Sequence, residues 1–125
     1  MTRAGIDVAI YADLLAERVA AIEGQRLELL AAIESTRSAR SLMFADDEHD
    51  PDGSTASLDQ ARDTALLERA EQTLVALAEA QQRISAGTYG ICNACGQAIS
   101  PERLRARPET RDCITCAAKR DRERR

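Results

Sequence analysis

The sequence predicts an all-α protein in which a long antiparallel helical hairpin precedes a small lobe that contains every cysteine. The chain has 125 residues, of which 44% are hydrophobic and 30% charged, yet it contains one Phe, two Tyr and no Trp. Its apolar residues are mainly Ala, Leu, Ile and Val, and they recur at helical spacing. Its four cysteines all fall between residues 92 and 116. This length suits one domain, and so few aromatic side chains favour long helices with narrow apolar seams over a β-sandwich or an α/β enzyme.

The first predicted helix runs from about Ile6 to about Phe44. Its apolar residues recur in steps of three and four, as in the buried stripe of a coiled coil. This seam contains Leu15, Val19, Ile22, Leu29, Ile33 and Met43, with Arg26, Thr36 and Arg40 as polar interruptions. Such a helix would span roughly 57 Å at 1.5 Å per residue, which is too long to be enclosed in a domain of this size.

The second predicted helix runs from about Ser57 to about Ala86, where Gly87 supplies the left-handed residue that ends it. Its seam contains Leu67, Ala70, Leu74, Leu77 and Ile84, with Gln81 as the one polar member. Two helices of similar length with a short connection bury their stripes most simply by folding back on each other. We therefore expect residues 1–86 to form an antiparallel coiled coil of roughly 40 Å or more, in a monomeric protein.

The connection between these helices, residues 46–54, is predicted to form an acidic tip. It holds five carboxylates within seven residues: Asp46, Asp47, Glu48, Asp50 and Asp52. Pro51 is expected to stop a continuous helix. The candidate N-caps of the next helix are Ser54, Thr55 and Ser57.

Three interpretations of this acidic tip stay open. It can be a solvated turn that only keeps the protein soluble. Its crowded carboxylates can instead capture a hard cation such as Mg²⁺. A Ca²⁺ loop in an EF-hand register from Glu48 to Asp59 is the third interpretation, although Asp59 stands where a bidentate Glu belongs.

The cysteines occur as two CxxC pairs, Cys92/Cys95 and Cys113/Cys116, separated by seventeen residues. This spacing is typical of a four-cysteine Zn²⁺ site, and Gly96 permits the tight turn after the first pair. Four thiolates leave the ion no open position, so one structural Zn²⁺ per chain is expected to stabilise the lobe by on the order of 10 kcal/mol. Two disulfides or a redox-active CxxC are the alternatives; the expected lack of a secretory signal argues against the disulfides, and the duplicated spacing argues against the redox motif.

The predicted zinc lobe comprises residues 87–125. Ser100 and Pro101 are typical of an N-cap followed by the first residue of a helix, which must end before Pro108. The last ten residues are highly charged and compatible with a C-terminal helix. Four arginines in the loop between the cysteine pairs can offset the charge of the thiolates: Arg103, Arg105, Arg107 and Arg111.

Charge is divided unevenly along the chain. Residues 1–101 carry 8 basic and 16 acidic side chains, a net −8, whereas residues 102–125 carry 9 and 5, a net +4. The acidic body argues against a dedicated DNA-binding protein, while the basic end can meet an acidic partner. Sixteen of the seventeen basic residues are Arg, a bias typical of GC-rich bacterial genomes. The first residues form no uninterrupted apolar segment, so we expect a cytoplasmic protein with no secretory signal or membrane span.

The segment TYGICNACGQAISPERLRARPETRDCITC, preceded by a long helical hairpin, closely resembles the DksA/TraR family of bacterial transcription regulators. The specific part is residues 87–116, which contain both CxxC pairs, their spacing and the ERLRARP segment. The resemblance implies a protein that binds RNA polymerase without binding DNA specifically. It also implies that the hairpin enters the secondary channel, that the acidic tip lies near the catalytic centre, and that promoter-complex stability changes, often with ppGpp.

Two features depart from the family pattern. The best-known family tip carries a DxxDxA motif; here Asp47 and Asp50 keep the separation, but no Ala follows. Two basic positions that contact ppGpp in the family correspond to Arg69 and Arg107 here. The resemblance implies that these two arginines are possible nucleotide or polymerase contacts. Two further positions that are lysine in the family pattern are alanine here, Ala76 and Ala117. The resemblance therefore implies a weak dependence on ppGpp, because a phosphate site loses affinity with its cations.

Two other functions stay open. A transcript-cleavage-type accessory factor would use a pair of tip carboxylates to hold a second Mg²⁺ in the polymerase active site. A zinc-ribbon nucleic-acid-binding or adaptor protein is the other, but the acidic body and the lack of stacking aromatics around the cysteines argue against it. No Ser/His/Asp set, phosphate-binding loop or open metal site indicates an independent enzyme.

Overall fold

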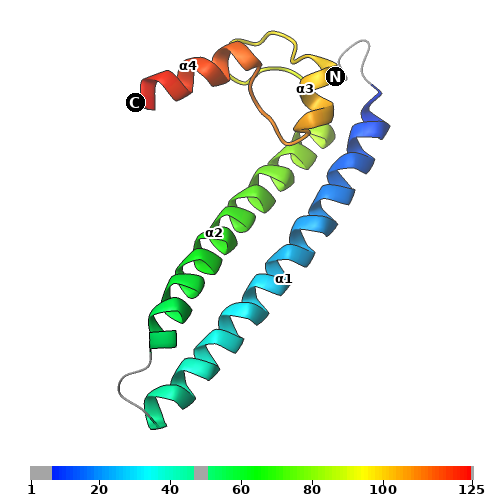
Figure 1. Cartoon of the computed structure of the whole chain (residues 1–125). Helices are drawn as coiled ribbons and strands as arrows, with labels where there is room; N and C mark the ends of the chain where they lie inside the picture. The colour runs from blue at the N-terminus through cyan, green and yellow to red at the C-terminus, as the bar shows by residue number, and fades with distance from the viewer. Residues whose placement is uncertain (1–6, 47–50, 125) are drawn as a thin grey trace. The chain divides into compact units, whose positions relative to one another are not determined.

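The computed structural model describes the backbone of residues 7–46 and 51–124, and the side chains of residues 7–42, 55 and 57–124. Four helices follow one another along the chain (Figure 1): α1 Val8–Asp46, α2 Pro51–Ala86, α3 Pro101–Ala106 and α4 Ile114–Arg124. The described residues contain no strand, and their β-structure is limited to an isolated bridge between Ile91 and Ala98. The predicted all-α fold with a helical hairpin and a four-cysteine lobe is confirmed. No described helix is both long enough and apolar enough to cross a membrane.

The chain divides into two compact units, one formed by residues 1–20 with 74–125 and the other by residues 21–73. The division expected from the sequence at residue 86 coincides with the end of α2. The boundaries of the compact units lie elsewhere. Residues 1–20 and the last part of α2 cluster with the zinc lobe rather than with the rest of the hairpin.

Within residues 21–73, the second part of α1 packs against the first part of α2 along the predicted seam. The α1 seam positions that the structure describes here are all partly buried: Ile22, Arg26, Leu29, Ile33, Thr36 and Arg40. Arg40 Nη1 donates a hydrogen bond to Gln60 Oε1 of the facing helix at 2.9 Å. Ala70 is the one described residue of this unit that is buried, at 6% exposure. This unit is therefore a thin helical pair with little enclosed core.

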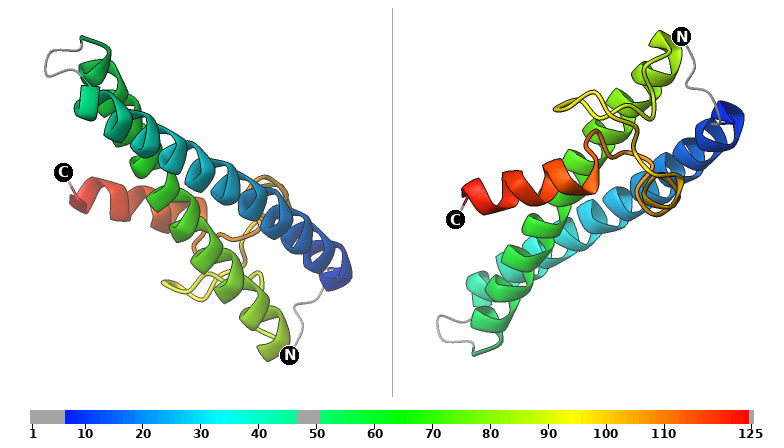
Figure 2. Two further views of the ribbon diagram at one scale, coloured as in Figure 1. Left: turned by 90° about the horizontal axis from the view of Figure 1, so that it is seen from below. Right: turned by 90° about the horizontal axis from the view of Figure 1, so that it is seen from above.

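Residues 1–20 with 74–125 contain most of the protein's buried apolar side chains. Its fully buried set includes Leu15, Leu77, Ala80, Tyr89, Ile99, Leu104 and Pro108. The rings of Tyr11 and Tyr89 have centroids 5.6 Å apart, and Tyr89 Oη donates to the Pro108 carbonyl at 2.8 Å. These contacts join the first turns of α1 to the segment between α2 and α4. That segment is mostly loop, and the short α3 is its one helix (Figure 2). This unit is the one in which the cysteine-containing lobe is built.

The start of α2 differs from the prediction. The helix begins at Pro51 rather than near Ser57, so Ser54, Thr55 and Ser57 lie inside it and are not N-caps. Proline suits this position because its fixed φ fits the first turn, where its missing N–H has no helical partner to lose. The helical backbone of Pro51–Asp59 also rules out the EF-hand interpretation, which requires an open loop there.

A second difference concerns the α2 seam near its end. Gln81, expected as a polar seam member, is exposed, whereas its neighbour Ala80 is fully buried. The seam therefore steps from Leu77 to Ala80 and then to Ile84. Steps of three and then four residues keep these side chains on the same helix face.

Leu77→Ala should lower the free energy of unfolding by about 2–5 kcal/mol, because Leu77 is 0% exposed and its truncation leaves a cavity in the core of residues 1–20 with 74–125. Leu58→Ala is the matched control, since Leu58 lies on the same helix but is 73% exposed. Chemical denaturation followed by circular dichroism measures both. Equal stability of the two variants would contradict the assignment of the core to this unit.

Candidate metal centre

The end of α2 directs the chain into the first cysteine pair. Thr88 N–H donates to the Arg83 carbonyl at 2.9 Å, and Gly87 N–H donates to the Ile84 carbonyl at 3.2 Å. These two bonds form a Schellman motif, and Gly87 has the left-handed φ of 78° that this motif requires. The predicted termination of the helix at Gly87 is therefore explained by its cap.

The first knuckle is a tight turn that presents Cys92 and Cys95 from one side. Cys92 N–H donates to the Gln97 carbonyl at 2.7 Å, and Gly96 N–H donates back to the Cys92 carbonyl at 2.9 Å. Gly96 has a φ of 74°, and a Cβ added there would meet nothing within 4 Å. Glycine is therefore needed here for the backbone conformation rather than for space.

The second knuckle is the start of α4. Cys113 precedes this helix and Cys116 lies in its first turn, where Ala117 N–H donates to the Cys113 carbonyl at 2.9 Å. The segment between the knuckles contains α3, which begins as predicted, with Ser100 Oγ accepting a hydrogen bond from Arg103 N–H at 3.3 Å. Helix α3 ends at Ala106, before Pro108.

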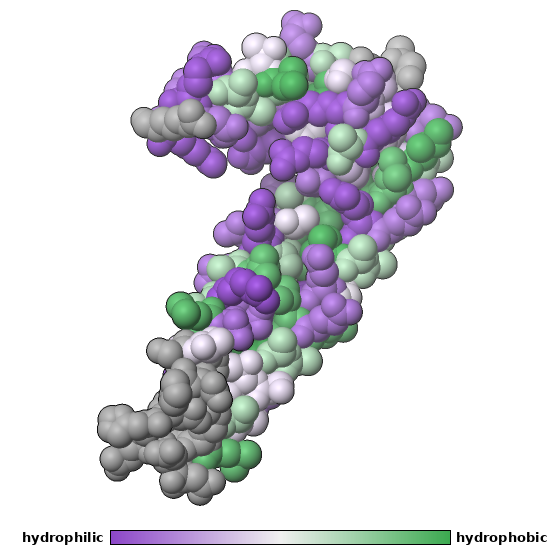
Figure 3. All heavy atoms as spheres, viewed as in Figure 1, coloured by the Kyte–Doolittle hydropathy of each residue, from purple (hydrophilic) through white to green (hydrophobic). Residues whose placement is uncertain are grey.

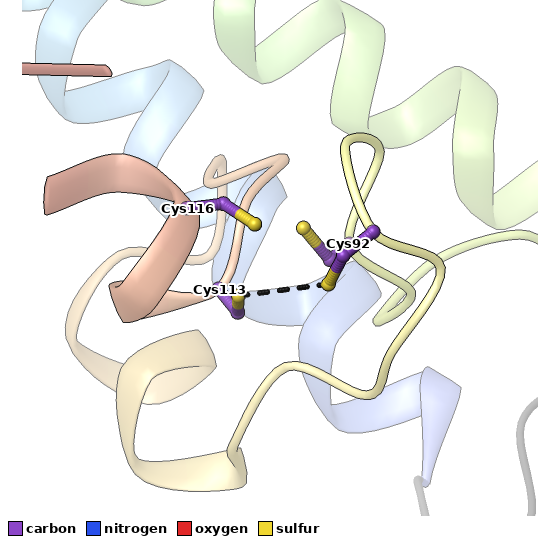
Figure 4. A group of neighbouring side chains, drawn as sticks. Cys92, Cys113 and Cys116 are labelled. Atoms are coloured by element: carbon purple, nitrogen blue, oxygen red, sulfur yellow. Dashed lines mark hydrogen bonds between the residues drawn. The ribbon is translucent and has the colours of Figure 1, made fainter. Parts of the chain in front are cut away.

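The four thiols meet at one point. The sulfur atoms of Cys92, Cys95, Cys113 and Cys116 all lie within 4.8 Å of one another. Cys95 Sγ and Cys113 Sγ are 3.9 Å apart, close to the edge of about 3.8 Å expected for a tetrahedron with Zn–S bonds of about 2.3 Å. Figure 4 shows the Cys92, Cys113 and Cys116 sulfurs directed toward a common centre. All four cysteines are free, which argues against two disulfides, and the donor set fits one Zn²⁺.

The protonation of these thiols also suits a cation. Burial raises the pKa of Cys92, but backbone N–H groups of Cys113, Cys95 and Ala94 stabilise its thiolate and lower the pKa to about 6. Hydrogen bonds with the Cys113, Cys95 and Cys92 side chains raise the pKa of Cys116 to about 12. The cluster therefore favours a thiolate at Cys92 and a protonated thiol at Cys116, whose proton a bound dication would release.

Arginines of the intervening loop act on the backbone as well as on the charge. Arg103 Nε donates to the Asp112 carbonyl at 2.9 Å, and its Nη2 donates to Thr110 Oγ1 at 3.2 Å. Arg83 Nη2, from α2, donates to the Glu109 and Thr110 carbonyls, each at 3.3 Å. Arg103 was expected from the sequence to lie near the thiolates, whereas Arg83 was not, because a helix arginine nine residues before Cys92 has no pattern that marks it.

A hollow of about 310 Å³ lies on the same unit, beside the metal centre. Ala76, Arg107 and Ala117, three of the positions named from the family resemblance, line this hollow. Further arginines also line it, namely Arg83, Arg103, Arg111, Arg120 and Arg124, together with the carboxylates Glu79, Glu109, Asp112 and Asp121. Figure 3 shows hydrophilic side chains over this part of the surface. Arg69 lines a different hollow, in residues 21–73, with Leu29 and Leu66.

The tip residues are the remaining predicted site. Asp47, Glu48 and Asp50 lie outside the described residues, and for Asp46 and Asp52 only the helical backbone is described. Their roles stay a prediction.

The described helices and the four-thiol centre define a helical-hairpin protein with a C4 zinc finger. Residues 87–122 match the family described as the prokaryotic dksA/traR C4-type zinc finger. Among solved structures, the chain is similar to transcription factor DksA2 from Pseudomonas aeruginosa, with 28% identity, a TM-score of 0.56, and coverage of 98% of this chain and 95% of that one. These findings confirm the resemblance to DksA/TraR proteins.

A curated relative from Aquifex aeolicus (strain VF5), an uncharacterized protein, is 47% identical over 51 residues. This match covers 41% of the chain and 35% of the relative, so the shared segment spans about a third of that protein's length. The four cysteines are thus those of a C4-type zinc finger and are positioned to bind one metal ion.

We expect one Zn²⁺ per chain, lost in Cys113→Ser because three thiolates cannot close the tetrahedral site. Thr115→Ser, an exposed change inside the same CxxC pair, is the matched control and should keep the metal. Metal analysis of protein purified under reducing conditions measures both. Full zinc content in Cys113→Ser would contradict the four-thiol site.

Proposed function

We propose that this protein is a transcription regulator that binds RNA polymerase and acts through its secondary channel. The observation that carries the proposal is the combination of a C4-type zinc finger match with similarity to a DksA transcription factor over 98% of the chain. Neither a zinc finger nor a helical hairpin alone would indicate this function. The protein then acts in the cytoplasm, where polymerase is found, as a monomer.

The character of residues 21–73 supports insertion into a channel. The described side chains of this unit form a helical pair with little enclosed core, so it offers its flanks rather than a cavity to a partner. Exposed leucines are available for docking on those flanks, namely Leu27, Leu30 and Leu66. The unit carries 5 basic and 12 acidic residues, a net −7, which opposes binding to the DNA backbone.

The metal centre supports a regulatory rather than an enzymatic role. Four thiolates saturate a tetrahedral ion, which leaves no position at which water or substrate could be activated. We therefore assign the zinc a structural role and propose that the protein is not an enzyme by itself.

The test of the proposal is binding to purified core RNA polymerase. The full chain should co-purify with polymerase, while bare promoter DNA at physiological salt should not be retarded by submicromolar protein because the body is acidic. Retardation of bare DNA without polymerase binding would favour the zinc-ribbon nucleic-acid-binding alternative. Binding to neither would favour an adaptor of another kind.

The tip is expected to act through negative charge. Replacing Asp47, Asp50 and Asp52 together by Asn should abolish the effect on promoter-complex lifetime and leave polymerase binding nearly intact, because docking energy comes from the flanks and the zinc lobe. Lifetimes are compared at equal polymerase occupancy. Wild-type behaviour of the triple variant would reduce the tip to a solvated loop, and loss of binding would make it an anchor.

The same triple variant separates the regulator from a transcript-cleavage-type accessory factor. A cleavage factor holds Mg²⁺ with its tip carboxylates, so the wild-type chain would stimulate cleavage in halted elongation complexes and the variant would not. A regulator of initiation should leave cleavage unchanged in both proteins.

We propose that ppGpp has only a weak effect on this protein. Ala76 and Ala117 leave two gaps in the cations around the 310 Å³ hollow, and its carboxylates offset part of the remaining arginine charge. Ala76→Lys with Ala117→Lys should increase the ppGpp-dependent change in promoter-complex lifetime. A large ppGpp effect in the wild-type chain, present only with this protein, would contradict the proposal.

A further inference from the structure

A buried carboxylate lies beside the four-cysteine centre. Asp112 is 2% exposed, and its Oδ1 is 4.0 Å from Cys92 Sγ. Its other oxygen, Oδ2, forms an ion pair with the Arg120 guanidinium of α4. None of the sequence patterns singled out Asp112 or Arg120.

Burying the Asp112 carboxylate costs free energy unless a cation or hydrogen-bond donors compensate for its lost hydration. A buried carboxylate must be paired and hydrogen-bonded to remain ionised. Here four thiolates around a dication would already carry a formal −2, so the carboxylate adds negative charge next to negative charge. The Arg120 guanidinium is the cation that contacts it directly.

The backbone of Asp112 is held by a different set of groups. Its carbonyl accepts hydrogen bonds from Arg103 Nε at 2.9 Å and from Thr110 Oγ1 at 3.0 Å. Asp112 is thus fixed through its main chain to the loop that contains α3, and through its side chain to α4. Because Cys113 follows directly in sequence, fixing Asp112 also fixes a thiol.

Arg120 belongs to the helix that carries the second cysteine pair. Cys113, Cys116 and Arg120 are separated by three and four residues, which places them on one face of α4 and the turn before it. The side chain of Arg120 is 36% exposed and that of Asp112 is 3% exposed, so the pair is shielded on the carboxylate side. One face of α4 therefore supplies two metal ligands and the countercharge.

We propose that Asp112 and Arg120 form a positioning pair, which seats the first two turns of α4 so that Cys113 and Cys116 meet Cys92 and Cys95, and which thereby sets the affinity of the site for zinc. This inference concerns the zinc lobe alone and does not depend on the proposed binding to polymerase. Neither residue belongs to the four-thiol donor set; they act by orienting α4, which carries Cys116 and directly follows Cys113.

The experiment measures zinc affinity by competition with a chelator of known affinity, using the full chain. Arg120→Gln should weaken zinc binding by about 10- to 100-fold, the range found when groups that orient metal ligands are removed. Arg120→Lys should recover part of the loss, because it keeps the charge but not the planar guanidinium. Arg122→Gln removes the same charge from an exposed position on the same helix and should bind zinc like the wild type.

Two further variants test whether the pair acts as a unit. Asp112→Asn should also bind zinc more weakly than the wild type, because α4 loses its tie to the loop. Asp112→Asn with Arg120→Gln should lose no more than Arg120→Gln alone, because the unpaired buried carboxylate is gone. Zinc binding by Asp112→Asn that is tighter than in the wild type would overturn the proposal, since the carboxylate would then weaken zinc binding by its negative charge and would not position the ligands.

Cobalt substitution supplies a readout that general stability does not move. Co²⁺ bound to four thiolates has ligand-field and charge-transfer bands that report its geometry. Arg120→Gln should change these bands and Arg122→Gln should not. Wild-type bands and wild-type zinc affinity in Arg120→Gln, or equal losses in Arg120→Gln and Arg122→Gln, would each overturn the positioning role.

Discussion

The convergence of four thiols on one metal ion is the constraint on which the zinc lobe depends. Between α2 and α4 the described chain is mostly irregular, with a single isolated bridge and the six-residue α3. Elements this short do not hold themselves together, and the free energy of metal binding, about 10–16 kcal/mol for structural Zn²⁺ in small fingers, exceeds what their packing can supply. Ile99 and Leu104 are buried within the loop that the metal would close, so the cross-link would hold these side chains in place.

The two compact units differ in where their stability resides. Residues 1–20 with 74–125 combine a buried apolar core with a metal cross-link. Residues 21–73 have one buried residue among those described, Ala70, and depend on a seam that is partly polar, with Arg40 hydrogen-bonded to Gln60. A helical pair of this kind would gain from a partner that covers its flanks, which fits the proposed insertion into a channel.

Features encoded by local chemistry were predictable from the sequence. Gly87 ends α2 because a left-handed residue is required there, Ser100 caps α3 because its hydroxyl accepts an early N–H, and the cysteine spacing encodes the metal site. The burial of Ala80 instead of Gln81 was missed. Ala80 and Gln81 follow Leu77 by three and four residues, and both spacings are compatible with a helical seam, so packing against neighbouring side chains decides between them.

Individual side-chain pairs between separate elements, unlike the helical hairpin and the cysteine cluster, were not predictable. The pairing of Asp112 with Arg120 depends on the direction in which α4 leaves the second knuckle, and no periodicity records that direction. Charge alone gave no signal either, because the last 24 residues contain nine basic side chains and only the fold distinguishes Arg120 among them.

The contact between Tyr11 and Tyr89 makes the protein its own optical probe. The chain has two tyrosines and no tryptophan, and both tyrosines are buried, at 5% and 2% exposure, with ring centroids 5.6 Å apart. Tyr89 is also hydrogen-bonded to the Pro108 carbonyl. Tyrosine emission from the unlabelled chain therefore originates at the single place where the first turns of α1 meet the entrance to the zinc finger. Any event that loosens the finger from that helix, such as removal of the metal, is visible there without a dye or an engineered residue.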